Sequence, residues 1–116
     1  MRVRRVVPNI HADDLAATRD FYVDALGFQV VMDLGWIVTV SAPDDPQRQI
    51  SIISEDATAP AHPDISIEVD DVDAAHEQAV QEGREIVHPL TDEAWGVRRF
   101  FCRDPSGTVV NILSHR

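Results

Sequence analysis

The sequence predicts an α+β fold built from two βαβββ repeats, and three observations support this. The chain has 116 residues, which suits one compact domain. Residues 12–31 resemble residues 69–87, and Asp13 corresponds to Asp70, an offset of 57 that is close to half the chain. Each of these segments has the pattern of a helix, with an apolar run before it and strand-like runs after it. We therefore expect a single domain over 1–116, with repeats at about 1–55 and 63–116.

Both helices are expected to begin at a pair of aspartates and to end at a glycine. The pairs are Asp13 with Asp14 and Asp70 with Asp71, and an aspartate side chain accepts hydrogen bonds from the free N–H groups of a helix start. The glycines are Gly27 and Gly83, because glycine adopts the left-handed cap without steric strain. Residues three or four apart share one face of each expected helix. These are Leu15, Thr18, Tyr22 and Ala25 in the first helix, and Val72, Ala75 and Ala79 in the second.

Strands are expected on both sides of each helix, where β-branched and aromatic residues are concentrated. The turn signal Asp104-Pro105-Ser106-Gly107 joins the last two strands, and residues 42–48 are also rich in turn-forming residues. Residues 55–63, rich in Ala and Pro, are expected to link the repeats. The predicted strands are 6–10, 28–32, 36–41 and 49–54 in the first repeat, and 65–69, 85–88, 97–103 and 108–114 in the second.

Composition excludes several classes of function. The formal charge of −10 repels polyanions, so we expect no nucleic-acid partner. All ten basic residues are Arg, which excludes Schiff-base chemistry, pyridoxal phosphate attachment and a phosphate-loop lysine. We expect no membrane span, because no window of about 18 uncharged apolar residues exists, and the N-terminal residues do not form a signal peptide. The single cysteine, Cys102, fits a cytoplasmic location.

Three segments carry a resemblance to a known family: DDLAATRDFYVDALGF (13–28), ISIEVDDVDAAHEQAVQEG (65–83) and RRFFCRDPSGTVVNIL (98–113). In these motifs the chain resembles the vicinal oxygen chelate superfamily, also called the glyoxalase/bleomycin resistance/extradiol dioxygenase family. The resemblance implies paired βαβββ modules whose curled mixed sheet encloses a groove, frequently as a homodimer. It also implies that the family's enzymes hold a divalent metal there, with His, Glu or Gln ligands from four strand positions.

Carried over to this chain, the four metal positions fall near Val7, Ser51, Asp64 and Asn111. Valine has no donor atom, serine and asparagine are weak ligands, and only the aspartate is a good one. The resemblance therefore implies no family metal site in this chain. An alternative is a divalent metal at a displaced site around His62 and Asp64, which are two residues apart and share a face if the strand already includes them.

A groove without a metal can still bind a small molecule. Trp36 and Trp95 adjoin glycines at the ends of strands, where a large ring either lines a groove or packs in the core. One arginine of the RRFF segment should point inward, either toward a ligand carboxylate or phosphate or into a structural ion pair, and we assign this place to Arg98. The candidate ligand-binding residues are Trp36, Ser51, Asp64, Trp95, Arg98, Phe100 and Asn111.

Two classes of function follow from the sequence. The first is a metal-independent protein that binds an aromatic or apolar small molecule, similar to the drug-sequestering members of the family. The second is an enzyme, either a lyase, isomerase or dioxygenase with a displaced metal, or a metal-free catalyst with Asp64 as general base. We favour the first, with no cofactor, no assigned catalytic residue and the homodimer that the resemblance implies.

Overall fold

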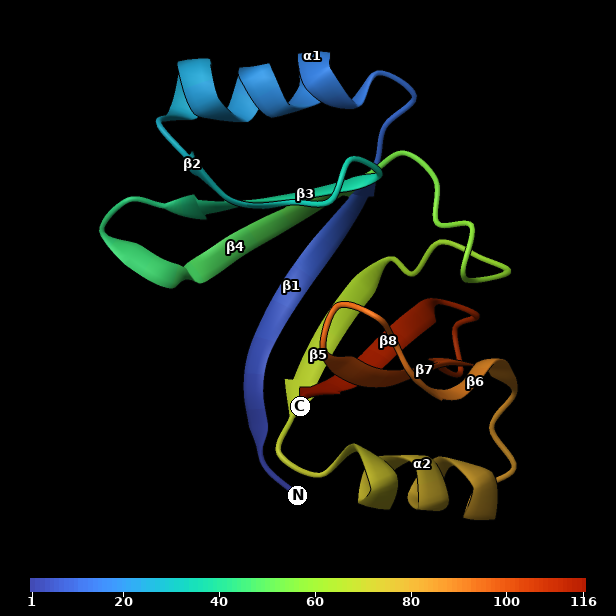
Figure 1. Cartoon of the computed structure of the whole chain (residues 1–116). Helices are drawn as coiled ribbons and strands as arrows, with labels where there is room; N and C mark the ends of the chain where they lie inside the picture. The colour runs from blue at the N-terminus through green and yellow to red at the C-terminus, as the bar shows by residue number, and fades with distance from the viewer. The chain divides into compact units, whose positions relative to one another are not determined.

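The computed structural model describes residues 1–116 and divides into two compact units. Unit 1 comprises Met1–Val6 and Ala59–Arg116, and unit 2 comprises Val7–Thr58. The first strand, β1 (Val3–His11), thus contributes its first residues to unit 1 and the others to unit 2. Eight strands and two α-helices confirm the predicted α+β class (Figure 1). None of the helices has the length and apolar character needed to cross a membrane.

Unit 2 is a four-stranded sheet with a helix on one face. Its strand order is β2-β3-β4-β1, in which β1 and β4 are parallel and the other pairs antiparallel. Much of the stretch that the sequence predicts as a turn is strand, because a short turn pairs Ala42 with Asp45. The elements after β1 are α1 (Leu15–Asp20), the π-helical turn η1 (Phe21–Ala25), β2 (Gln29–Asp33), β3 (Ile37–Ala42) and β4 (Asp45–Ile53).

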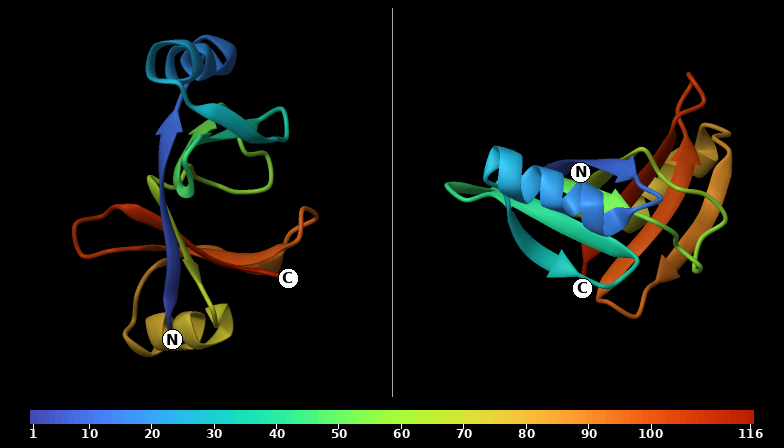
Figure 2. Two further views of the ribbon diagram at one scale, coloured as in Figure 1. Left: turned by 90° about the vertical axis from the view of Figure 1, so that its left-hand side faces the viewer. Right: turned by 90° about the horizontal axis from the view of Figure 1, so that it is seen from above.

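Unit 1 repeats this plan. Its strand order is β1-β5-β8-β7-β6, in which β5 and β8 are parallel and the last three strands antiparallel. The left view in Figure 2 shows α2, in yellow, lying along one side of this sheet. The elements are β5 (Ile65–Val69), α2 (Val72–Gln81), β6 (Ile86–Asp92), β7 (Val97–Arg103) and β8 (Val109–His115).

The helix signals in the sequence have the expected roles. The Asp14 carboxylate accepts a hydrogen bond from the Ala17 N–H, and the Asp71 carboxylate accepts one from the Ala74 N–H, each at 3.0 Å. The two caps therefore occupy the same place in the two repeats. Gly83 adopts a positive φ of 73° just after α2, as the predicted left-handed cap requires.

The core of unit 1 lies between α2 and the sheet. The predicted helix face of Val72, Ala75 and Ala79 is buried, which confirms the helical spacing. It packs against Phe100 and Cys102 of β7. No residue of α1 or η1 is buried to the same degree, so the two equivalent helices differ in how much of their surface they bury.

Candidate functional site

The register of the β7–β8 hairpin decides which side chains share a face in unit 1. Arg99 lies opposite Leu113, and Phe101 lies opposite Asn111. Directly opposed residues of an antiparallel pair project to the same side of the sheet. We call this side the Asn111 face; Phe100 packs on the other side, beneath α2.

The sequence-based prediction that Arg98 and Phe100 share the face of Asn111 is therefore wrong. Phe100 is fully buried in the core beneath α2. Arg98, an even number of residues away on the same strand, projects to the same side as Phe100. The register of the hairpin places the odd-numbered residues of β7 on the Asn111 face. Arg99, and not Arg98, therefore points to this side of the sheet.

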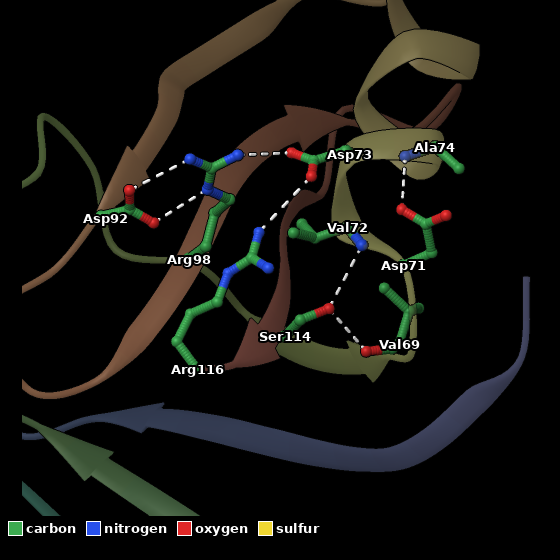
Figure 3. Close-up of polar contacts among 9 residues, drawn as sticks. All are labelled: Val69, Asp71, Val72, Asp73, Ala74, Asp92, Arg98, Ser114 and Arg116. Atoms are coloured by element: carbon green, nitrogen blue, oxygen red, sulfur yellow. Dashed lines mark hydrogen bonds and ion pairs between the residues drawn. The ribbon is translucent and has the colours of Figure 1, made fainter.

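Arg98 takes part in a structural ion-pair network at the protein surface (Figure 3). Its guanidinium donates to both carboxylate oxygens of Asp92, at 2.8 and 3.0 Å, and to Asp73 at 2.7 Å. Arg116 reaches the second oxygen of Asp73 at 3.4 Å. Hydrogen bonds from Arg98 hold the pKa of both Asp73 and Asp92 below the ordinary value, and the same bonds raise the pKa of Arg98. This Arg98 network joins the first turn of α2, the end of β6 and the C-terminal residue.

Arg99 forms a buried ion pair with Glu93. Its Nη2 donates to Glu93 Oε2 at 2.7 Å, and the two side chains are 6% and 5% exposed. The centre of the guanidinium lies 4.9 Å from the centroid of the Trp95 ring and 4.8 Å from that of Phe101. Such cation–π contacts orient both the arginine and the rings. The Arg99 guanidinium thus holds the half-buried indole of Trp95. The Glu93 carboxylate in turn fixes the position of the guanidinium.

His88 completes this cluster. It lies on β6 opposite Phe101, with the ring centroids 4.9 Å apart. Its Nε2 is 3.7 Å from Glu93 Oε1, so imidazole and guanidinium lie near different oxygens of one carboxylate. We call His88, Glu93, Trp95, Arg99 and Phe101 the Arg99 cluster. It combines an acid, a base, a fixed cation and two aromatic rings on the Asn111 face.

Four members of this cluster are absent from the sequence-based set: His88, Glu93, Arg99 and Phe101. The signal for Arg99 lies in the turn Asp104-Pro105-Ser106-Gly107. Pairing residues outward from that turn brings Phe101 opposite Asn111 and Arg99 opposite Leu113. No comparable local signal marks His88 or Glu93, because the pairing of β6 with β7 contains two irregularities.

Asn111 and Asp64 also belong to unit 1. Asn111 is buried, and its Nδ2 donates to Ser66 Oγ on the neighbouring strand β5 at 3.0 Å. Asp64 is exposed just before β5, where its backbone N–H donates to the Val109 carbonyl at 2.9 Å.

The other two predicted residues, Trp36 and Ser51, belong to unit 2. Ser51 is buried on β4, with its Oγ 2.8 Å from Thr39 Oγ1 on the adjacent strand. Trp36 is half-buried before β3, and its carbonyl accepts a hydrogen bond from the Ser54 N–H at 2.9 Å.

At three of the four family metal positions the side chain either has no donor atom or is already hydrogen-bonded. Val7 is buried and has no donor atom, while the side chains of Ser51 and Asn111 are each hydrogen-bonded to a neighbouring hydroxyl. Nowhere in 1–116 do three or more His, Cys, Asp or Glu side chains gather as a metal site requires. At the displaced position, both His62 and Asp64 are exposed.

Comparisons with known proteins establish the family. The model of the Glyoxalase/Bleomycin resistance protein/Dioxygenase superfamily matches residues 4–112, and the chain belongs to this superfamily. No curated protein matches the sequence.

Solved structures show the same fold. A superfamily member from Vibrio splendidus 12B01 is 16% identical, with a TM-score of 0.73 over 97% of this chain and 99% of its own. The methylmalonyl-CoA epimerase of Mycobacterium tuberculosis is also 16% identical, with a TM-score of 0.72 over 98% of this chain and 87% of its own. The Mn(II)-bound glyoxalase of Novosphingobium aromaticivorans is 19% identical, with a TM-score of 0.65 over 97% of this chain and 38% of its own. At these identities the similarity concerns the fold alone.

Proposed function

We propose that the protein binds a small aromatic or apolar molecule, without a metal ion, at the Arg99 cluster. The observation that carries this proposal is the half-buried indole of Trp95 beside the guanidinium of Arg99, which Glu93 holds in place. An aromatic surface fixed before binding loses little conformational entropy when a flat ligand stacks on it. Trp95 is therefore the residue that we expect to contact the ligand.

The charge of the cluster supports an uncharged ligand. Arg99 and Glu93 neutralise one another at 2.7 Å, and Asn111 and Ser66 on the same face add only neutral polar groups. A buried ion pair gives little net stability compared with apolar side chains of similar size.

At three of the four family positions, all except that of Asp64, the donor atoms support binding without a metal. Val7 offers none, and the hydroxyl and amide at Ser51 and Asn111 are weak ligands already engaged by Thr39 and Ser66. Arg99 is a fixed cation and is not a ligand for a metal ion.

A second candidate is a metal-free acid–base catalyst, which the pairing of His88 with Glu93 favours. The 3.7 Å between His88 Nε2 and Glu93 Oε1 allows the carboxylate to orient the imidazole. In that case His88, and not the exposed Asp64, acts as the base. The two candidates are distinguished by His88→Gln, which abolishes turnover of a bound compound if the protein is an enzyme.

A thermal-shift screen of neutral and carboxylated aromatic compounds on chelator-dialysed protein tests the proposal. A ligand at about 100 times its Kd stabilises the folded state by about 2.7 kcal/mol, which corresponds to a rise in Tm of roughly 10 °C for a domain of this size. We expect Trp95→Ala and Arg99→Met to lose the response and the surface variant Arg98→Met to keep it. Hits that need an added metal, or that bind Trp95→Ala as well as the wild type, contradict the proposal.

A further inference from the structure

Asn111 carries a buried acceptor atom to which no group of the chain donates. Its Nδ2 donates to Ser66 Oγ at 3.0 Å, but its Oδ1 is buried and has no hydrogen-bond partner. The residue as a whole is only 8% exposed. Most buried polar atoms of folded proteins are hydrogen-bonded, and a buried acceptor without a donor destabilises the folded state. The chain therefore retains an oxygen that does not contribute to its own stability.

The register of the sheet relates this oxygen to the Arg99 cluster. Asn111 lies directly opposite Phe101, and the two side chains project to the same face. The ring of Phe101 lies against the Arg99 guanidinium, which also contacts the ring of Trp95. The residue with the unpaired oxygen is thus the cross-strand neighbour of the aromatic groups that we propose to bind a flat ligand.

The oxygen differs from the other polar groups of this face in charge and in pairing. Arg99 donates to one carboxylate oxygen of Glu93, and His88 lies near the other. Asn111 Oδ1 is neutral and has no such partner. A neutral acceptor can be paired by a neutral N–H or O–H group, which brings no unpaired charge into a buried place. The complementary ligand is therefore an uncharged ring that carries a donor.

We propose that Asn111 Oδ1 selects aromatic ligands with an N–H or O–H donor at the edge of the ring, as in an indole or a phenol. This selection rests on the proposed function and narrows it from aromatic or apolar molecules in general to aromatic hydrogen-bond donors. The ring of the ligand contacts the Arg99 cluster, and its donor pairs with the amide oxygen. Because Oδ1 is covered in the unliganded chain, a neighbouring side chain moves as the ligand enters, which lowers the affinity for all ligands alike.

Three bicyclic compounds of similar size test the selection on the wild type. Indole carries only a donor, quinoline only an acceptor, and benzothiophene neither, and their Kd values are measured by NMR titration in the presence of a chelator. One net hydrogen bond corresponds to a roughly 3- to 10-fold difference in Kd, and we expect indole to bind more tightly than the other two by this factor. Tighter binding of quinoline means that the amide presents its N–H group to the ligand. That result, or equal Kd values for indole and benzothiophene, overturns the proposal.

Asn111→Leu removes the acceptor at a similar side-chain volume. The matched control is Arg98→Met, on the opposite side of β7. We expect Asn111→Leu to bind indole and benzothiophene equally and Arg98→Met to keep the preference for indole. The unliganded Asn111→Leu should have a Tm equal to or above that of the wild type, because an apolar group replaces an unpaired buried oxygen. A preference that persists in Asn111→Leu, or a fall in its Tm of more than about 5 °C, overturns the proposal.

Trp95→Ala separates failure of the selection from failure of the proposed function. If indole and benzothiophene bind the wild type equally and both lose binding in Trp95→Ala, the site at the Arg99 cluster stands and selection by Asn111 is wrong. If none of the three compounds binds the wild type, or if all bind Trp95→Ala equally well, the selection fails together with the proposed binding of aromatic rings at Trp95.

Discussion

Arg99 and Glu93, six residues apart in sequence, form an ion pair of 2.7 Å whose side chains are 6% and 5% exposed. Their neighbours Arg98 and Asp92 form a second pair at the surface, on the opposite side of β7. One strand thus places two consecutive arginines in different surroundings. The buried pair organises the Asn111 face, while the exposed pair joins elements at the surface.

Removing one partner of the buried pair should destabilise the protein strongly. Glu93→Gln leaves the Arg99 guanidinium without its counter-charge away from water, and we expect a loss of about 3–5 kcal/mol in the free energy of unfolding by urea. The double variant Glu93→Gln/Arg99→Met should recover much of that loss. Glu85→Gln, at an exposed pair with Arg103, should change stability by less than about 1 kcal/mol. Equal losses in Glu93→Gln and Glu85→Gln would falsify the assignment.

Acid should weaken the Arg98 network. The pKa of Asp73 and of Asp92 is lowered in the folded state, so their stabilisation is present above the unfolded value of about 3.9 and disappears as the pH falls through the folded pKa. The stability difference between the wild type and Arg98→Met should therefore be larger at pH 7 than at pH 2. In Arg98→Met, NMR titration should show a higher pKa for Asp92. An unchanged difference at both pH values contradicts this role.

The cap of α2 should depend on an acceptor and not on charge. Asp71→Ala removes the hydrogen bond to the Ala74 N–H, and we expect it to lower the unfolding free energy by about 1 kcal/mol. Asp71→Asn keeps the acceptor and should change little. Urea unfolding of the two variants checks this, and similar losses in both would show that the carboxylate acts through its charge.

The thiol of Cys102 should react slowly in the folded protein. It is buried in the core beneath α2, and burial raises the pKa of the thiol. Ellman's reagent at pH 8 should label one thiol quickly in urea and far more slowly in buffer. Rapid labelling of the folded chain would mean that β7 opens readily on its helix side.

The repeat explains why so much of the fold is predictable from sequence. The aspartate caps at Asp14 and Asp71 and the helix face of Val72, Ala75 and Ala79 depend on local spacing, and the structure confirms them. The face of Arg98 is different, because it depends on the register of β7 against β8. A shift of one residue in this register turns every side chain of a strand to the other face of the sheet. The sequence-based assignment therefore places Arg98 and Phe100 on the face that Arg99 and Phe101 occupy. The contact of Glu93 with Arg99 depends on a turn whose path the sequence does not specify.

The indole N–H signals of the two tryptophans give the most direct test of metal-independent binding at the Arg99 cluster. The chain has only Trp36 and Trp95, so a ¹⁵N correlation spectrum shows two indole peaks, which Trp36→Phe assigns. We expect a stabilising aromatic compound from the screen to move the Trp95 peak saturably in chelator-dialysed protein, and to leave it unmoved in Arg99→Met. A compound that binds without moving the Trp95 peak, or that moves it only after a divalent metal is added, would contradict metal-independent binding at the Arg99 cluster.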